Sequence, residues 1–138
     1  MSIVHAELVE ALVLDLCAGS GALGLEALSR GAAHVDFVEQ APASLRTLAG
    51  NIDLLGAADR CAVIKADAMR HVAGLRAGAY DVAFADPPYA DRTAAAIAEQ
   101  WLRVPFAHIL GVEHAASLQL PGGGDTRRYG DTALTFFR

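Results

Sequence analysis

Residues 13–24 decide the fold of this 138-residue chain, and they read Val13-Leu14-Asp15-Leu16-Cys17-Ala18-Gly19-Ser20-Gly21-Ala22-Leu23-Gly24. The apolar run over 11–16 predicts a buried strand, and the run over 22–29 predicts a helix with its large apolar side chains on one side. Between them, Gly19-Ser20-Gly21 predicts a tight turn. A strand, a glycine-rich turn and a helix in this order are typical of the first unit of a nucleotide-binding α/β sheet.

Strand and helix patterns alternate along the rest of the chain. Further strands are expected over 33–39, 62–66, 80–85 and 108–113, and helices over 43–55, 68–75 and 93–102. This alternation predicts a mostly parallel sheet with helices on both of its faces.

The tail of the chain has a different pattern. Two strand-like runs, over 117–120 and 133–137, are separated by Pro121-Gly122-Gly123-Gly124 with no long helix between them. They predict an antiparallel pair. No linker divides the chain, so we expect a single α/β domain over 1–138, with a Rossmann-like sheet that ends in a C-terminal antiparallel hairpin.

The composition excludes several classes of protein. Hydrophobic residues make up 54% of the chain and charged residues 20%, which indicates a globular domain and not a disordered segment. The two cysteines do not suggest a disulfide framework, and no apolar run approaches the ~20 residues of a membrane span. We therefore expect a cytoplasmic protein with reduced thiols and no membrane partner. The histidines have no metal-ligand spacing, so no metal site is expected. A net charge of −5 argues against a surface that binds the backbone of a nucleic acid without a partner.

Asp15 distinguishes between two possible ligands of the glycine-rich turn. The spacing of Gly19, Gly21 and Gly24 also fits a dinucleotide site, and the glycines can equally serve only the turn and its packing. A carboxylate at the end of the strand, just before the turn, repels pyrophosphate and attracts a cation. S-adenosylmethionine carries an ammonium and a sulfonium group, so we expect this cofactor and disfavour a nicotinamide dinucleotide.

Two more acids end neighbouring strands. Glu39 follows the second predicted strand, where a carboxylate can accept hydrogen bonds from both hydroxyls of a ribose, although an ordinary surface acid is the alternative. Asp67 follows the third, where it either accepts from the amino group of an adenine or caps the next helix. Because the carboxyl ends of parallel strands meet at one edge of a sheet, Asp15, Glu39 and Asp67 are expected to lie together.

The stretch Asp86-Pro87-Pro88-Tyr89 follows the predicted strand over 80–85. A proline pair donates no backbone N–H and fixes φ, so the strand stops there. The Asp86 carboxylate and the Pro87 carbonyl can accept the protons of an exocyclic amino group and orient its lone pair, and Tyr89 can stack on an extruded base. A plain Pro-Pro turn is the alternative. The two half-sites together indicate methyl transfer to an amino nitrogen.

These motifs resemble the RsmD family, bacterial enzymes that methylate the N2 amine of a guanine in 16S ribosomal RNA. The likeness extends from residue 11 to residue 138. The family's cofactor loop resembles residues 13–32, with Cys17 where phenylalanine is usual, and its ribose-binding strand end resembles residues 37–39. Its catalytic corner resembles residues 86–89, its fifth strand residues 112–114, and its closing hairpin residues 128–134. The resemblance implies a class I S-adenosylmethionine-dependent methyltransferase fold and activity, with 16S rRNA or a small-subunit assembly intermediate as the substrate.

The motifs and the resemblance together give the expected site residues. The catalytic residues are expected to be Asp86, Pro87, Pro88 and Tyr89. The cofactor contacts are expected to be Asp15, Cys17, Ala18, Gly19, Ser20, Gly21, Glu39, Gln40, Asp67, Ala68 and Asp86.

The N-terminus is the main departure from the family. RsmD proteins have a longer segment before the first strand, including a basic arm for RNA, whereas the residues over 1–10 here are not basic. We therefore expect RNA binding that is weak or depends on a partner. Adenine-N6 or other amino-group methylation, and a cofactor-binding module without turnover, are the alternative functions.

Overall fold

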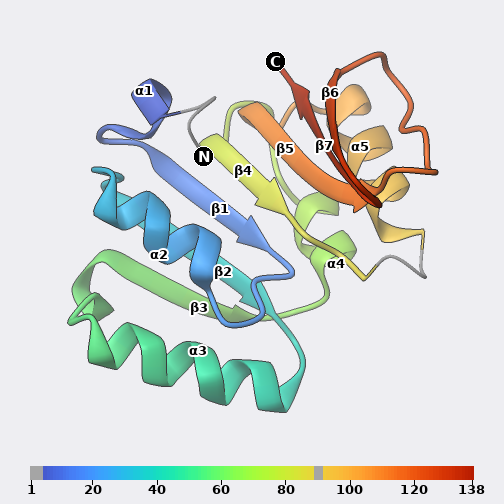
Figure 1. Cartoon of the computed structure of the whole chain (residues 1–138). Coiled ribbons are helices and arrows are strands. Elements are labelled where there is room, and N and C mark those ends of the chain that lie inside the picture. The colour runs from blue at the N-terminus through green and yellow to red at the C-terminus, as the bar shows by residue number, and fades with distance from the viewer. Residues whose placement is uncertain (1–4, 89–91) are drawn as a thin grey trace.

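The computed structural model describes residues 5–88 and 92–138, which form a seven-stranded sheet with helices on both faces (Figure 1). The strands lie in the order β3-β2-β1-β4-β5-β7-β6. Their bounds are β1 (Leu12–Leu16), β2 (His34–Glu39), β3 (Cys61–Lys65), β4 (Tyr80–Ala85), β5 (Ala107–Ala115), β6 (Asp125–Tyr129) and β7 (Thr132–Phe137). The first five strands run parallel, and β7 pairs antiparallel with both β5 and β6. The predicted mostly parallel α/β sheet with an antiparallel hairpin at its end is confirmed.

Helices cover the two faces of the sheet in pairs. α2 (Ala22–Ser29) and α3 (Pro42–Leu54) lie over one face, and α4 (Ala68–Ala73) and α5 (Thr93–Arg103) lie over the other (Figure 1). Two short elements were not predicted, and they are α1 (His5–Leu8) and the 3₁₀ helix η2 (Ala58–Arg60). That residues 1–138 form a single domain stays a prediction. Among the described residues, no helix combines the length and the apolar character that crossing a membrane requires.

The side chains of β1 alternate between two cores. Val13 packs with Phe37 and Leu48 on the side of α2 and α3. Leu14 and Leu16 point the other way and pack in the core beneath α4 and α5. A strand that is buried on both faces must be apolar along most of its length, which explains the continuous apolar run that predicted it.

Gly24 allows α2 to lie close against β2. A Cβ atom at this position would lie 2.3 Å from Cε1 of Phe37 and 2.9 Å from Cγ1 of Val35. Interiors are close-packed, so a larger residue would push the helix away from the sheet. The last glycine of the turn motif is therefore a packing residue.

The prediction of a strand over 117–120 is wrong. The first strand of the closing hairpin is β6, and 117–120 form a turn and a loop in which Leu118 and Leu120 pack against the core. β6 is the exposed edge of the sheet, so its residues are mostly polar and show no apolar alternation. Gly130, with a φ of 62°, opens the two-residue turn between β6 and β7, where a positive φ is required.

The order of the strands reverses between β1 and β4. From β1 the chain continues through α2 to β2 on one side, and from β4 it continues through α5 to β5 on the other side. In open α/β sheets, ligands bind in the crevice outside the carboxyl ends of the strands at such a switch point. The glycine turn follows β1 and the Asp86 corner follows β4, so both lie at this crevice.

Candidate active site

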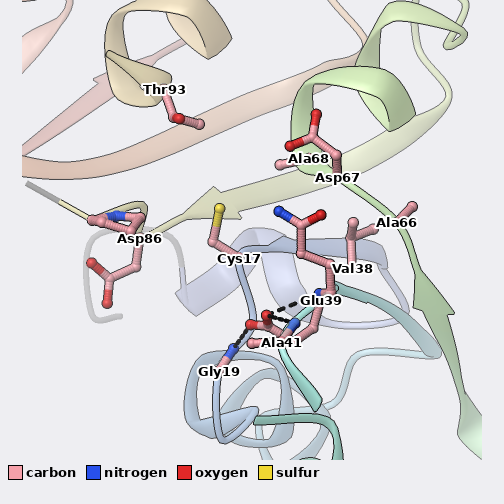
Figure 2. Close-up of a pocket in the computed structure, with 12 residues that line it drawn as sticks. Cys17, Gly19, Val38, Glu39, Ala41, Ala66, Asp67, Ala68, Asp86 and Thr93 are labelled. Atoms are coloured by element: carbon pink, nitrogen blue, oxygen red, sulfur yellow. Dashed lines mark hydrogen bonds between the residues drawn. The ribbon is translucent and has the colours of Figure 1, made fainter. Parts of the chain in front are cut away.

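A cavity of about 330 Å³ lies at the carboxyl edge of the sheet, beside the ends of β1, β2, β3 and β4 (Figure 2). It is lined by Cys17, Gly19, Val38, Glu39, Gln40, Ala41, Ala66, Asp67, Ala68, Asp86, Pro88 and Thr93. Three of these side chains are carboxylic acids, and none of the described lining residues is basic. The cavity therefore favours a cationic ligand over a phosphate.

Glu39 connects two segments of the cavity wall, the glycine turn after β1 and the loop after β2. Its Oε1 accepts a hydrogen bond from the Gly19 amide at 2.7 Å, and its Oε2 accepts from the amides of Gln40 and Ala41, both at 2.9 Å (Figure 2). A carboxylate offers about four acceptor positions, so it has room for one more donor. Glu39 can thus hold the glycine turn and still accept a hydrogen bond from a ligand hydroxyl.

The turn after β1 is held in left-handed backbone conformations. Gly19 and Gly21 have φ angles of 56° and 84°, and Cys17 has a φ of 56°. Glycine adopts this region freely, whereas a residue with a side chain loses about 1–2 kcal/mol there. The side chain of Cys17 points into the cavity (Figure 2). Strain of this kind at a non-glycine residue is commonly found at ligand sites.

Asp15 lies beneath the glycine turn and not on the cavity lining. The residue is 1% exposed, and its Oδ2 accepts a hydrogen bond from the Gly24 amide at 3.0 Å. Burial raises the pKa of Asp15 to about 7; the Gly24 hydrogen bond opposes this shift, and the charges of Asp86 and Glu39 add to it. Asp15 makes no contact with the cavity. When ionised, it therefore acts on a cation there only through its electric field.

Asp67 begins α4 as its N-cap residue. Its Oδ2 accepts a hydrogen bond from the Arg70 amide at 3.1 Å, which is the helix-capping role that the sequence left open. The same side chain also lines the cavity (Figure 2). Its remaining acceptor capacity is available to a ligand amino group, so capping and ligand binding do not exclude each other.

The proline corner borders the cavity after β4. Asp86 and Pro88 line the cavity, and Pro87 does not. Tyr89 lies outside the described residues, so its stacking role stays a prediction. The side chain of Glu113, on β5, hydrogen-bonds with Asp86. Burial, the hydrogen bond and the charge of Asp86 together raise the pKa of Glu113 to about 7.

The chain matches a known family along its whole length: the family model described as "Conserved hypothetical protein 95" covers residues 1–138. The chain belongs to this family. "Putative rRNA methyltransferase YlbH" of Bacillus subtilis (strain 168) is 33% identical over 136 residues, which cover 91% of this chain and 74% of that protein. "Ribosomal RNA small subunit methyltransferase D" of Escherichia coli (strain K12) is 40% identical over 82 residues, 59% of this chain and 40% of that protein.

A solved structure agrees with these matches. The structure titled "Putative methyltransferase yhhF from Escherichia coli" superposes with a TM-score of 0.82 and 27% identity, over 98% of this chain and 78% of that one. The resemblance to the RsmD family is thereby confirmed, and so is the class I methyltransferase fold.

The structure brings most of the expected RsmD-type site residues to one cavity. Those on its lining are Cys17, Gly19, Glu39, Gln40, Asp67, Ala68, Asp86 and Pro88. The expected residues that do not reach the lining are Asp15, Ala18, Ser20, Gly21 and Pro87. Their roles as contacts stay predictions, and the burial of Asp15 shows that a residue at a strand end can point beneath the site instead of into it.

The sequence analysis missed four further residues of the cavity lining: Val38, Ala41, Ala66 and Thr93. The first three lie within two positions of Glu39 or Asp67, so the strand ends already indicated where they are. Thr93 is the first residue of α5, and only the fold brings it to the cavity. In the described ranges 5–88 and 92–138, no group of three or more His, Cys, Asp or Glu side chains is arranged to hold a metal ion.

Proposed function

We propose that this chain is an S-adenosylmethionine-dependent methyltransferase that acts on the exocyclic N2 amine of a guanine in 16S rRNA. The observation that carries the proposal is the acidic cavity at the switch point, with the glycine turn on one side and the Asp86 corner on the other. An enzyme that transfers a methyl group between two ligands needs both half-sites at one cavity.

The cavity fits the proposed cofactor in its charge and in its acceptors. S-adenosylmethionine supplies a methyl group on a sulfonium centre, and its two positive charges suit a cavity whose described lining has acids and no basic residue. We assign the ribose hydroxyls to Glu39 and the adenine amino group to Asp67. Cys17 and Gly19 of the turn lie against the same cavity, and the glycine leaves the backbone open to close approach.

Asp86 is assigned the catalytic role. The amino nitrogen of a base is a weak nucleophile while its lone pair is delocalised into the ring. The Asp86 carboxylate and the Pro87 carbonyl accept its two protons and hold the lone pair in line for attack. The nitrogen becomes positive as it reacts, so the fixed negative charge of Asp86 stabilises the transition state more than the ground state.

The rRNA substrate is inferred from the relatives. Two of them are named as rRNA methyltransferases, and the Escherichia coli protein is named for the small ribosomal subunit, although the match covers only 40% of its length. An rRNA substrate implies a cytoplasmic enzyme. With a net charge of −5, this chain binds RNA weakly or together with a partner.

The test is methyl transfer from radiolabelled S-adenosylmethionine to 16S rRNA and to small ribosomal subunits, both isolated unmethylated. Digestion to nucleosides then identifies the product. N2-methylguanosine supports the proposal in full, whereas N6-methyladenosine supports the adenine alternative. Cofactor binding without methyl transfer to either acceptor supports a binding module without turnover.

A further inference from the structure

Glu113 and Asp86 are neighbours across β4 and β5. Ala85 pairs with Val112 in the parallel register, so the next residues along the two strands are Asp86 and Glu113. Side chains alternate along β5, so Glu113 lies on the face of the sheet that carries Phe84, and Asp86 directly follows the end of β4. Their carboxyl groups hydrogen-bond to each other. This pair could not be predicted from the sequence, because the two residues are far apart in the chain.

Asp86 is held differently from the other acids of the site. The carboxylates of Asp15, Glu39 and Asp67 all accept hydrogen bonds from backbone amides. An aspartate in a turn commonly accepts from the amide two residues ahead, but both residues that follow Asp86 are prolines and have no N–H. Among the described residues, the hydrogen-bond partner of the Asp86 carboxyl is Glu113.

A hydrogen bond between two carboxyl groups requires a proton on one of them, because an ionised carboxylate only accepts. The two carboxyl groups therefore share a proton. Burial first, and then the hydrogen bond to Asp86, raise the pKa of Glu113 to about 7. In this hydrogen bond Glu113 is therefore the donor and Asp86 the acceptor.

We propose that Glu113 is a positioning residue that holds the Asp86 carboxylate through a shared proton and orients it toward the amino group of the substrate. The effect on methyl transfer rests on the proposed function, whereas the pairing itself does not. During transfer, the N–C bond forms while the S–C bond breaks and leaves its electron pair on sulfur. The nitrogen then loses one proton to Asp86, and the pair releases that proton to solvent.

Few other charged groups face this pair. Asp15 of β1 lies on the same face as Phe84, its register partner, and its charge interacts with that of Asp86. In the hairpin, Leu134 of β7 pairs with Glu113 of β5 on one side and with Arg127 of β6 on the other. β7 itself carries no titratable residue. The neighbour of Glu113 on its own strand, His114, points to the opposite face, where it bonds to Thr135.

The pairing predicts an alkaline limb in the pH profile of kcat at saturating cofactor. On the alkaline side, Glu113 loses the shared proton, and the two like charges push Asp86 out of position. The alkaline limb is the distinctive feature, because a residue with a purely structural role does not create one.

The first test measures kcat against pH for wild type, Glu113→Gln and Glu113→Ala, with unmethylated 16S rRNA as acceptor. The Gln amide donates to Asp86 at every pH, so Glu113→Gln is expected to keep kcat within about threefold at pH 7 and to lose the alkaline limb. Glu113→Ala leaves Asp86 without a partner and is expected to lower kcat at least tenfold with KM for the cofactor little changed. Glu99→Gln, an exposed acid on α5, is the matched control.

The second test needs no turnover. The side-chain carboxyl carbon of Glu113 is titrated by NMR in the cofactor-free protein, for wild type and for Asp86→Asn. A midpoint near 7 in wild type that moves toward the ordinary glutamate value in Asp86→Asn supports the shared proton. An ordinary midpoint in both proteins overturns the pairing, and a wild-type kcat profile in both Glu113 variants overturns the positioning role. If wild type shows the raised midpoint but no turnover on rRNA, the proposed function fails while the pairing stands.

Discussion

The Gly19 amide donates a hydrogen bond of 2.7 Å to Oε1 of Glu39, so the end of β2 holds the glycine turn that follows β1. The other oxygen of the same carboxylate accepts from the amides of Gln40 and Ala41. One acid thus fixes the wall of the cavity before a ligand binds. A site organised in advance loses less entropy on binding, which strengthens affinity.

Replacing Glu39 with alanine tests this organisation. Three amides lose their acceptor, so we expect the free energy of unfolding to fall by about 1–3 kcal/mol and the affinity for S-adenosylmethionine to fall at least about tenfold. Urea denaturation and calorimetry measure the two effects. Glu99→Ala removes an exposed acid from α5 and is expected to change stability by less than about 0.5 kcal/mol. Equal affinity in wild type and Glu39→Ala would contradict the assignment.

Two glycine-to-alanine changes test the packing of α2 against β2. Gly24→Ala places a Cβ 2.3 Å from Cε1 of Phe37, and we expect it to destabilise the fold by about 1–3 kcal/mol. Gly50 lies within α3 with open space around it, so Gly50→Ala is expected to stabilise the protein by about 0.5–1 kcal/mol. Thermal unfolding distinguishes the two. Similar shifts of the unfolding temperature in both variants would mean that the close contact with Phe37 is not the reason why residue 24 is a glycine.

Asp15→Asn tests the buried carboxyl through pH. Asparagine keeps an acceptor for the Gly24 amide but has no charge. In wild type the folded state binds the Asp15 proton more tightly than the unfolded chain does, since the pKa rises from 3.8 to about 7 on folding. This group therefore lowers the free energy of unfolding as pH rises through that window, and the variant is expected to gain stability relative to wild type there.

Ionisation of Asp15 lowers folding stability but favours binding of a cationic ligand. Ionised Asp15 attracts the cationic cofactor, so the affinity of wild type for S-adenosylmethionine is expected to rise between about pH 6 and 8. The slope should be shallower in Asp15→Asn. Calorimetry at several pH values checks this, and parallel pH dependences in the two proteins would show that Asp15 exerts no field on the ligand.

Much of the fold could be predicted because local patterns and long-range packing agree. The bounds of α2 and β4 match the prediction, since each is set by a strong local signal: a glycine turn before α2 and a proline pair after β4. The prediction of the first strand of the hairpin failed because the local pattern and the packing disagree there. β6 lies at the sheet edge with polar residues, while Leu118 and Leu120 in the preceding loop supply the apolar pattern of a strand.

The site shows a similar division. Glu39, Asp67 and Asp86 each follow a strand, and the ends of parallel strands meet at one edge of the sheet, so the rule for strand ends predicted that these acids lie near one another. The rule does not say to which face a side chain points, so it did not foresee that Asp15 is buried under the turn. Nor could it find Glu113, whose partner is set by the pairing of β4 with β5 and not by any spacing along the chain.

In the proposed function, the Asp86 corner promotes methyl transfer to an amino group next to a cofactor held by the glycine turn. The most direct measurement compares wild type with Asp86→Asn for labelled methyl transfer from S-adenosylmethionine to unmethylated 16S rRNA, with cofactor affinity measured in parallel. We predict N2-methylguanosine with wild type, and with Asp86→Asn a loss of kcat of about a hundredfold or more at a cofactor affinity within about threefold of wild type. Undiminished turnover in Asp86→Asn would contradict the catalytic role of Asp86, and no cofactor binding by either protein would contradict the role of the glycine turn.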